Sequence, residues 1–192
     1  SQINPHFLYN TLNSIKWMAT IQGATGISEM TTSLSRLLKS ISKGTSLLID
    51  IREELSLLEN YFTIQSYRYG GTITMDIQVD NESLYNSEII KFTLQPLVEN
   101  ALYHGIKNKR GKGMIRIEGE LDGEDCILLI TDNGKGMTPE RLEQVRKGIR
   151  NRKARETDIY GLYNVNERIR LNFGENYGIT ITSTYGEGTC VT

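Results

Sequence analysis

The chain has 192 residues, of which 38% are hydrophobic and 23% are charged, a composition typical of a globular protein and not of a disordered tail. This length corresponds to one large domain or two small ones. Lysine and arginine total 22 against 23 aspartates and glutamates, which gives a net charge of −1. The chain therefore lacks the excess of positive charge that a dedicated nucleic-acid-binding protein uses.

Residues 1–70 show helical periodicity and almost no strand signal. Pro5 suits the first turn of a helix, and apolar residues recur at three- and four-residue spacing from Leu8 to Met18. Gly23 and Gly26 interrupt this pattern, so we expect the first helix to end there.

Two further helices follow. Apolar residues over 34–41 mark a short second helix, and Asp50 followed by Glu53 forms a capping-box pattern at the start of a third, which stops at Gly70. Three amphipathic helices with modest cores predict a helical hairpin that dimerises, and we assign them to a first domain over residues 1–70.

Strands and helices alternate in the rest of the chain. The Asp122-Gly123 dipeptide predicts the turn of a hairpin. The mixture predicts, for a second domain over residues 71–192, an α/β sandwich with one mixed sheet and helices on one face, so that the whole chain is of the α+β class. The expected elements are a strand at 73–79, a helix at 89–105, the hairpin over 115–130, a helix at 139–147, a polar and basic loop at 148–160, a helix at 161–173, and strands at 178–185 and 189–192.

The cysteines and the apolar runs argue against a zinc site and against a membrane-spanning segment. Cys126 and Cys190 stand in no metal-binding motif, so no zinc site is predicted and both are interpreted as reduced thiols. The longest apolar run, residues 126–130, is far shorter than the about 20 residues that a membrane span needs. We therefore expect no membrane contact by this segment.

A histidine lies in the first turn of the first predicted helix. The unprotonated imidazole of His6 is a nucleophile near neutral pH, and Asn10 lies one turn further along the same face. An ordinary surface histidine has the same local pattern, so the assignment depends on the rest of the chain.

A second polar cluster falls in the helix predicted at 89–105. Asn100, Tyr103 and His104 share one helical face, and an amide oxygen, a phenol and an imidazole together suit a hydrated Mg²⁺ ion and a nucleotide. A polar helix face with a buried asparagine is the alternative that these residues leave open.

The segment 132–137, Asp-Asn-Gly-Lys-Gly-Met, follows a strand and precedes a helix. Its glycines let the backbone approach a ligand closely. The carboxylate of Asp132 at the strand end is suited to accept a hydrogen bond from an amino group such as N6 of adenine. Taken alone, the segment also matches an ordinary turn.

A glycine and a cationic run suggest a phosphate site. Gly161 is expected to open a helix, where free N–H groups bind phosphate. Residues 146–155, just before it, carry six lysines and arginines. We interpret this run as a cationic lid over phosphates, with a solvated charged loop as the alternative.

Together and in this order, these segments resemble the sensor histidine kinases of two-component signalling, most closely their LytS/YesM-type branch. The phosphoacceptor box of that family is similar to residues 2–13, its N box to 94–105, its G1 box to 132–137 and its G2 box to 160–165. The segment Gly186-Glu187-Gly188-Thr189 resembles the closing Gly-Thr of the same ATP-binding domain.

The resemblance implies a dimerisation and histidine-phosphotransfer domain followed by an ATP-binding domain of the Bergerat, or GHKL, fold. His6 would be the phosphoacceptor, and Asn10 would orient water in the reverse, phosphatase reaction. Asn100 would hold Mg²⁺, and Asp132 would bind the adenine amino group. The implied ATP-binding residues are Asn100, Tyr103, His104, Lys107, Asp132, Asn133, Gly134, Gly136, Met137, Gly161, Leu162, Tyr163 and Thr189.

Within this set the resemblance implies further roles. His104 would flank the base and Thr189 would lie near it. Gly161 with Leu162 would start the phosphate-binding helix, and the glycines of segment 132–137 would shape the pocket wall.

Three positions depart from the family pattern. Tyr103 stands where related kinases often have a phosphate-contacting lysine, so that charge must come from Lys107, Lys109 or the cationic run. Ile159 replaces the first glycine of the G2 box. Phe7 follows the histidine where many kinases carry an acid, which leaves no adjacent carboxylate to deprotonate His6.

The implied reaction transfers the γ-phosphoryl group of ATP, with Mg²⁺, to a ring nitrogen of His6, and then to an aspartate in the receiver domain of a response regulator. We expect a homodimer through the helical domain, and we interpret the segment as the cytoplasmic portion of a membrane-anchored receptor of the bacterial inner membrane. One alternative is a GHKL clamp that hydrolyses ATP; Pro96 stands where such clamps carry their water-activating glutamate, although Glu99 is nearby. The other is a non-enzymatic, dimerising nucleotide-binding scaffold.

Overall fold

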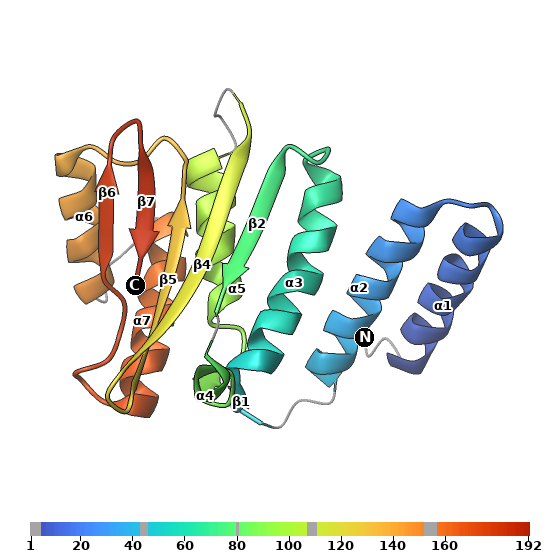
Figure 1. The fold of residues 1–192 in the computed structure, drawn as a ribbon, viewed down its shortest axis with the longest axis horizontal. Coiled ribbons are helices and arrows are strands. Elements are labelled where there is room, and N and C mark those ends of the chain that lie inside the picture. Colours follow the sequence, from blue (N-terminus) through green and yellow to red (C-terminus); the bar gives the residue numbers. More distant parts are fainter. Residues whose placement is uncertain (1–4, 43–45, 80, 107–110, 152–156) are drawn as a thin grey trace.

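The computed structural model describes residues 5–42, 46–79, 81–106, 111–151 and 157–192. Helices α1 (Pro5–Ile21) and α2 (Thr25–Ser42) form a hairpin at one side of the molecule (Figure 1). The first helix confirms its prediction. Gly26, however, lies inside α2 and does not break this helix. A glycine is needed there because α2 passes close to α3: a Cβ at this position would lie 2.8 Å from Cε1 of Tyr67.

Helix α3 (Ile51–Arg68) connects the hairpin to the rest of the molecule. As predicted, Asp50 caps it, and its Oδ1 accepts a hydrogen bond from the backbone N–H of Glu53 at 2.7 Å. Leu55 and Leu58 of this helix are buried in the same hydrophobic core as the strands of the sheet. The division of the chain near residue 70 stays a proposal, and the structure adds that α3 packs against both parts.

The helix predicted at 89–105 is wrong at its start. Residues Glu88–Ile90 form strand β3, which pairs with strand β1 (Leu48–Asp50) in a small antiparallel sheet. Ile89 and Ile90 are β-branched and buried, which favours a strand. The helical segment begins afterwards as α5 (Leu94–Asn100) and continues as a π-helix over Ala101–Ile106.

The main sheet has five strands in the order β2-β4-β5-β7-β6. Among the strands that the structure describes, only β2 and β4 pair in parallel, and β4 and β5 form the predicted hairpin about Asp122 and Gly123. A short helix α4 (Glu82–Tyr85) follows β2. The strand bounds are β2 (Ile73–Gln78), β4 (Gly113–Asp122), β5 (Asp125–Asp132), β6 (Ile181–Thr184) and β7 (Gly188–Val191).

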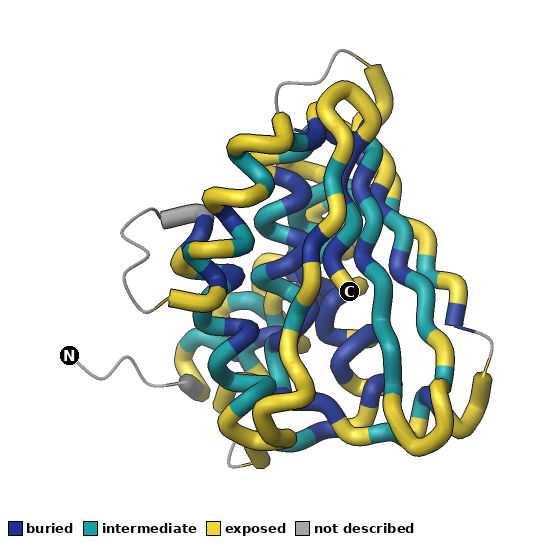
Figure 2. Tube along the Cα trace, turned by 90° about the vertical axis from the view of Figure 1, so that its left-hand side faces the viewer, coloured by how far each residue is buried: buried dark blue, intermediate teal, exposed yellow. Residues whose placement is uncertain are grey.

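Helices cover one face of this sheet. Helices α5 and α7 (Thr157–Phe173) lie behind it, and α6 (Pro139–Arg150) lies beside its β6 edge (Figure 1). Figure 2 shows the buried residues gathered between the sheet and these helices. This arrangement confirms the predicted α+β class with an α/β sandwich. Among the described helices, none has the length and the hydrophobicity that a bilayer crossing requires.

The loop predicted at 148–160 is wrong at both of its ends, which are helical. Helix α6 runs to Arg150 and α7 begins at Thr157, while residues 152–156 lie outside the described part of the chain. Gly161 therefore lies one turn inside α7, and the expectation that it opens this helix is wrong.

A buried carboxylate fixes the start of α5. Glu54 of α3 is 2% exposed, and its two oxygens accept hydrogen bonds from the backbone N–H groups of Phe92 and Leu94, each at 2.8 Å. Arg168 of α7 donates to the carbonyls of Lys91 and Phe92, at 2.7 and 3.4 Å. Three segments thus converge on the turn before α5. Burial raises the pKa of Glu54, and these backbone hydrogen bonds and Arg168 partly offset that effect.

We expect Glu54 to give the stability of the protein a pH dependence opposite to that of an ordinary paired carboxylate. Because its pKa is raised above 4.5 in the folded protein, the folded state binds this proton more tightly than the unfolded state does. Its contribution to the free energy of unfolding therefore falls as pH rises from about 4.5 through the raised pKa. Urea unfolding between about pH 4 and pH 8 should show the wild type losing stability relative to Glu54→Gln. A constant difference would contradict this expectation.

Candidate nucleotide site

A cavity of about 180 Å³ lies at the end of the sheet where β5 stops and β7 begins. Its walls come from α5 with the π-helix, from the loop after β5, and from α6, α7 and β7. The lining residues are Asn100, His104, Gly105, Asp132, Lys135, Gly136, Met137, Arg141, Val145, Ile159, Leu162 and Thr189. The structure therefore brings together seven of the residues predicted to bind ATP, from four separate segments.

Asp132 is one of the residues that line the cavity. It is the last residue of β5, paired with Ile115 on one side and Thr189 on the other, and it is 6% exposed. Its Oδ1 accepts a hydrogen bond from the N–H of Gly134 at 2.7 Å. A buried carboxylate held in this way presents an acceptor to a ligand with an amino group.

Two glycines let the loop after β5 press against the π-helix. A Cβ on Gly134 would lie 2.4 Å from the Cα of Gly105, and one on Gly105 would lie 2.7 Å from Oδ1 of Asp132. The N–H of Lys135 donates to the Gly105 carbonyl at 3.0 Å. Any side chain at these two glycines would separate the loop from the helix that carries Asn100.

Thr189, which lines the cavity, pairs with a second hydroxyl on the neighbouring strand β6. Ser183 Oγ accepts from the N–H of Met137 at 2.9 Å, donates to the carbonyl of Gly188 at 2.8 Å, and lies 2.9 Å from Oγ1 of Thr189. Because the Ser183 proton is used by Gly188, Thr189 is the donor of this pair and keeps lone pairs for a ligand. Ser183 was missed from the sequence, since nothing local marks its register opposite Thr189.

Helix α5 and the π-helix that continues it each present one polar side chain to the cavity. Asn100 ends α5 and His104 follows four residues later, so that both lie on the cavity side. A π-helical turn shifts side chains relative to their positions in an α-helix, and such turns are frequent at functional sites. The neighbouring residues Leu102 and Ile106 are buried in the core.

The residues present fit a magnesium ion that arrives with a nucleotide. The amide oxygen of Asn100 is a hard donor of the type that Mg²⁺ accepts, with waters and phosphate oxygens completing its coordination. Within the described ranges there is no group of three or more His, Cys, Asp or Glu side chains placed to hold a metal by themselves.

Other predicted ATP-binding residues lie elsewhere. The amide of Asn133 joins β5 to the start of β4, accepting from the N–H of Met114 at 2.8 Å and donating to the carbonyl of Lys112 at 3.3 Å. Tyr103 is exposed beside α3, and Lys107 lies outside the described residues. Gly161 and Tyr163 lie within α7, next to Leu162, which does line the cavity.

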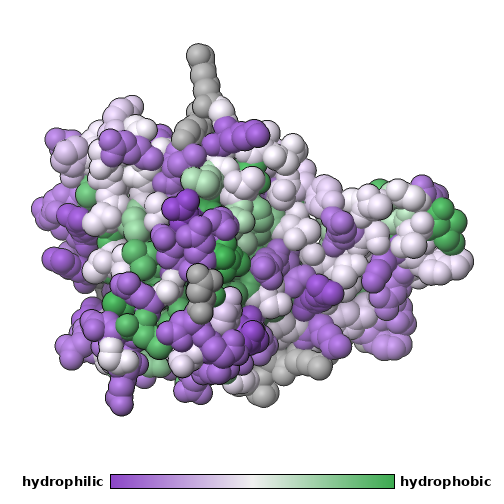
Figure 3. Space-filling model, in the orientation of Figure 1, coloured by the Kyte–Doolittle hydropathy of each residue, from purple (hydrophilic) through white to green (hydrophobic). Residues whose placement is uncertain are grey.

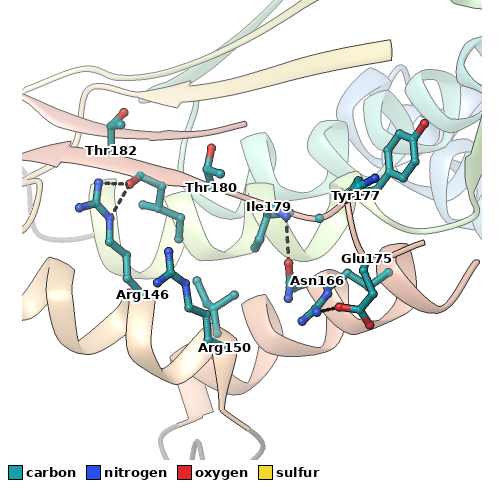
Figure 4. A pocket seen from close by; sticks show the side chains of 13 residues that line it. Arg146, Arg150, Asn166, Glu175, Tyr177, Ile179, Thr180 and Thr182 are labelled. Atoms are coloured by element: carbon teal, nitrogen blue, oxygen red, sulfur yellow. Dashed lines mark hydrogen bonds and ion pairs between the residues drawn. The ribbon is translucent and has the colours of Figure 1, made fainter. Parts of the chain in front are cut away.

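Half of the cationic run, Arg146, Lys147 and Arg150, lies on α6, whereas Arg152, Lys153 and Arg155 lie outside the described residues. Arg146 donates through Nε and Nη2 to the carbonyl of Ile181, at 3.0 and 2.7 Å, and with Arg150 lines a separate groove of about 520 Å³ between α6, α7 and the start of β6 (Figure 4). The interpretation of these two arginines as a phosphate lid is therefore wrong. The cations that line the nucleotide cavity, Lys135 and Arg141, were not singled out from the sequence.

The predicted phosphoacceptor is exposed on α1. His6 Nδ1 lies 3.3 Å from Nδ2 of Asn10, one helical turn away. Helix α1 is separated from the cavity by α2 and α3 (Figure 1). The arrangement shown by this chain does not bring His6 to the nucleotide cavity.

The hairpin exposes many large hydrophobic side chains. Trp17 is 69% exposed, and Ile21 and Ile27 flank the turn between α1 and α2. Figure 3 shows hydrophobic side chains at that outer end of the hairpin. An exposed apolar set of this kind on two helices is typical of a surface that a partner covers.

Family profiles match both parts of the chain. The family described as "Histidine kinase" matches residues 1–73, and that described as "Histidine kinase-, DNA gyrase B-, and HSP90-like ATPase" matches residues 85–192. The fold and the cavity are thus those of a GHKL-type ATPase domain preceded by helices. The chain belongs to the sensor histidine kinases, and its relatives place it in their LytS/YesM-type branch.

Two relatives illustrate this relationship. Sensor histidine kinase YesM of Bacillus subtilis (strain 168) is 37% identical over 191 residues, which cover 98% of this chain and 31% of YesM. Sensor histidine kinase YpdA of Escherichia coli (strain K12) is 35% identical over 180 residues, which cover 93% of this chain and 30% of YpdA. The chain therefore spans about a third of the length of the curated relatives it matches.

Solved structures agree with the fold. The histidine kinase domain of the blue-light activated kinase from Erythrobacter litoralis EL346 aligns with a TM-score of 0.54 at 17% identity, over 97% of this chain and 93% of that one. The catalytic domain of histidine kinase ThkA aligns with a TM-score of 0.52 at 15% identity, over 75% of this chain and 90% of that one.

Proposed function

We propose that this segment is the kinase core of a two-component sensor, which binds ATP with Mg²⁺ in the cavity and phosphorylates His6. The observation that carries the proposal is the meeting of Asn100, Asp132 and Thr189 in one cavity. In this scheme the buried Asp132 carboxylate binds the adenine amino group and His104 flanks the base. Bound Mg²⁺ would neutralise phosphate charge, with Asn100 as its protein ligand.

In the proposed transfer, a lone pair on a ring nitrogen of His6 attacks the γ-phosphorus of ATP, and the bond from that phosphorus to the β,γ-bridging oxygen breaks as ADP leaves. The attacking nitrogen must be unprotonated. The Asn10 amide offers both an oxygen and an NH₂ group, so it is able to hold either imidazole tautomer. The phosphoryl group then passes to an aspartate of a response-regulator receiver domain.

The separation of α1 from the cavity requires a change of arrangement or a second copy. We propose that a homodimer forms through the exposed apolar side chains of the α1–α2 hairpin, and that His6 reaches a cavity by movement of the hairpin or in the partner copy. The parent protein is proposed to be membrane-anchored, with this segment in the cytoplasm.

The residues just before Asn100 distinguish the kinase from an ATP-hydrolysing clamp. An ATP-hydrolysing clamp needs a glutamate to activate water, and Pro96 occupies that position. Glu99 is nearby, but its Oε1 accepts a hydrogen bond from the Tyr61 hydroxyl of α3 at 3.0 Å, on the side away from Asn100 and His104. This arrangement favours the kinase over the clamp.

Counting ADP released from excess ATP and Mg²⁺ separates the three functions. The kinase should release about one ADP per chain and then stop, because His6 is consumed as it is phosphorylated. Continuous release would support the clamp. Absence of any ADP release would support the non-enzymatic scaffold and refute the proposed function.

We expect Asn10→Ala to separate the forward reaction from its reversal. The γ-phosphoryl transfer needs the His6 nitrogen and the ATP site, which this change leaves in place, whereas the phosphatase step loses the amide that orients water beside His6. Autophosphorylation should stay within about threefold of the wild type, and dephosphorylation of the phosphorylated regulator should fall by at least about tenfold. Ser14→Ala, one turn further along α1, is the matched control. Equal loss of both activities would contradict the assignment.

A further inference from the structure

The groove between α6 and α7 has features of a ligand site that the nucleotide cavity does not explain. This α6–α7 groove is lined by residues of both helices and by segment 175–182, and it encloses about 520 Å³ (Figure 4). That volume is within the range of sites that bind small molecules. Ile149 of α6 and Ile181 of β6 are buried and belong to its lining, so part of its wall is apolar.

The charged side chains of the α6–α7 groove leave an excess of positive charge. Arg170 is paired with Glu167 and with Glu175, an acidic residue of the groove lining. Arg150 forms no hydrogen bond or ion pair with any described residue, and its side chain rises from α6 toward the strand, as does that of Arg146 (Figure 4). An unpaired guanidinium with a second one on the same wall favours an anionic ligand.

A further hydrogen-bond donor comes from α7. Asn166 is 5% exposed and lines the α6–α7 groove. Its Oδ1 accepts a hydrogen bond from the N–H of Ile179 at 3.0 Å, which orients the amide, whereas its NH₂ group makes no hydrogen bond with any described residue. Because polar groups of buried side chains normally have a partner, this NH₂ group is placed to donate to a ligand.

We infer that the α6–α7 groove is a binding site for a small organic acid. Its carboxylate would accept hydrogen bonds from the guanidinium of Arg150 and from the NH₂ group of Asn166, and its apolar body would lie against Ile149 and Ile179. A guanidinium presents two parallel N–H donors that match the two oxygens of a carboxylate. The isoleucines favour such an acid over inorganic phosphate, which has no apolar surface to bury.

The α6–α7 groove shares its helices with the nucleotide cavity. Val145 of α6 and Leu162 of α7 line the cavity, whereas Arg150 and Asn166 of the same two helices line the groove. An acid that bridges Arg150 and Asn166 would hold α6 against α7, the arrangement in which the cavity walls are formed. Each ligand is therefore expected to raise the affinity for the other. This consequence rests on the proposed function, whereas the site itself does not.

Titration of the whole chain with hexanoate, without nucleotide, tests the site, and the backbone N–H resonance of Ile179 reports on it by NMR. We expect a saturable shift with a dissociation constant on the order of 1 mM. Binding should weaken at least about tenfold in Arg150→Leu and in Asn166→Asp, which keeps the Oδ1 acceptor but replaces the NH₂ group with a charged oxygen. Lys147→Gln removes an α6 lysine that pairs with Glu143 outside the groove lining and should change nothing.

Two further ligands separate the charge from the apolar body. Hexanamide, which lacks the charge, and inorganic phosphate, which lacks the apolar body, should each bind at least about tenfold more weakly than hexanoate. Phosphate binding as tight as that of hexanoate would overturn the inference, as would an Arg150→Leu chain that binds hexanoate like the wild type.

The link to the nucleotide cavity has its own measurement. Saturating hexanoate should raise the calorimetric affinity for ATP with Mg²⁺ about fivefold in the wild type and leave it unchanged in Arg150→Leu. An unchanged or lower wild-type affinity would refute the link. A chain that binds no ATP would refute the proposed function, and the hexanoate titration would still decide whether the groove is a site.

Discussion

Asp132→Asn should weaken ATP binding on the order of 10- to 100-fold while leaving the fold intact. The substitution keeps the shape of the side chain and an oxygen able to accept from the N–H of Gly134. It replaces the other carboxylate oxygen with an NH₂ group, which would face the amino group of adenine donor to donor at a residue that is 6% exposed.

The control for this change lies on the same strand. Asp125 begins β5, as Asp132 ends it, and accepts a hydrogen bond from the Tyr177 hydroxyl at the opposite end of the sheet. Calorimetric titration should give an unchanged ATP affinity for Asp125→Asn and similar melting temperatures for both variants. If Asp132→Asn binds ATP as the wild type does, Asp132 is not the residue that binds the base.

Gly136→Ala should lower the free energy of unfolding by about 3 kcal/mol and abolish nucleotide binding. Gly136 has φ of +63°, which costs an L-residue about 1 kcal/mol, and its added Cβ would lie 1.9 Å from the carbonyl oxygen of Thr184. That oxygen belongs to the backbone of β6 and has no flexible end to move aside. The loop after β5 must therefore shift, and Met137 in the cavity wall shifts with it.

Gly186→Ala isolates the conformational part of this effect. Gly186 also has a positive φ, of +86°, but a Cβ there would meet no described atom within 4 Å. Urea unfolding should show a loss of only about 1 kcal/mol for Gly186→Ala, and its ATP affinity should be retained. Equal losses in the two variants would mean that the clash at Thr184 does not contribute.

The sequence predicted the elements whose signals are local. The capping box at Asp50 and the Asp122-Gly123 turn were read correctly because each is set by neighbouring residues. The start of the helix at 89–105 was wrong because its limits depend on distant partners: β3 is formed by pairing with β1, and α5 begins at Leu94, whose N–H donates to Glu54. Such contacts leave no periodic trace in the segment itself.

The site residues, too, were predicted where the signal is local and missed where it depends on distant contacts. Motif residues such as Asp132 and Asn100 were found from their spacing and meet in the cavity. Arg141 was missed because only the packing of α6 decides which of its faces lines the cavity. The contact that Arg146 makes with the carbonyl of Ile181 depends on α6 lying against β6, and the two elements are far apart in the sequence.

The central claim is that His6 is phosphorylated from ATP bound in this cavity. Incubation with γ-labelled ATP and Mg²⁺, followed by acid and base treatment, tests it directly. We expect a label that is lost in acid, survives base, and is absent from both His6→Gln and Asp132→Asn, because the first lacks the acceptor and the second lacks the nucleotide. A label that persists in His6→Gln, or ATP binding without any labelled histidine, would contradict the account.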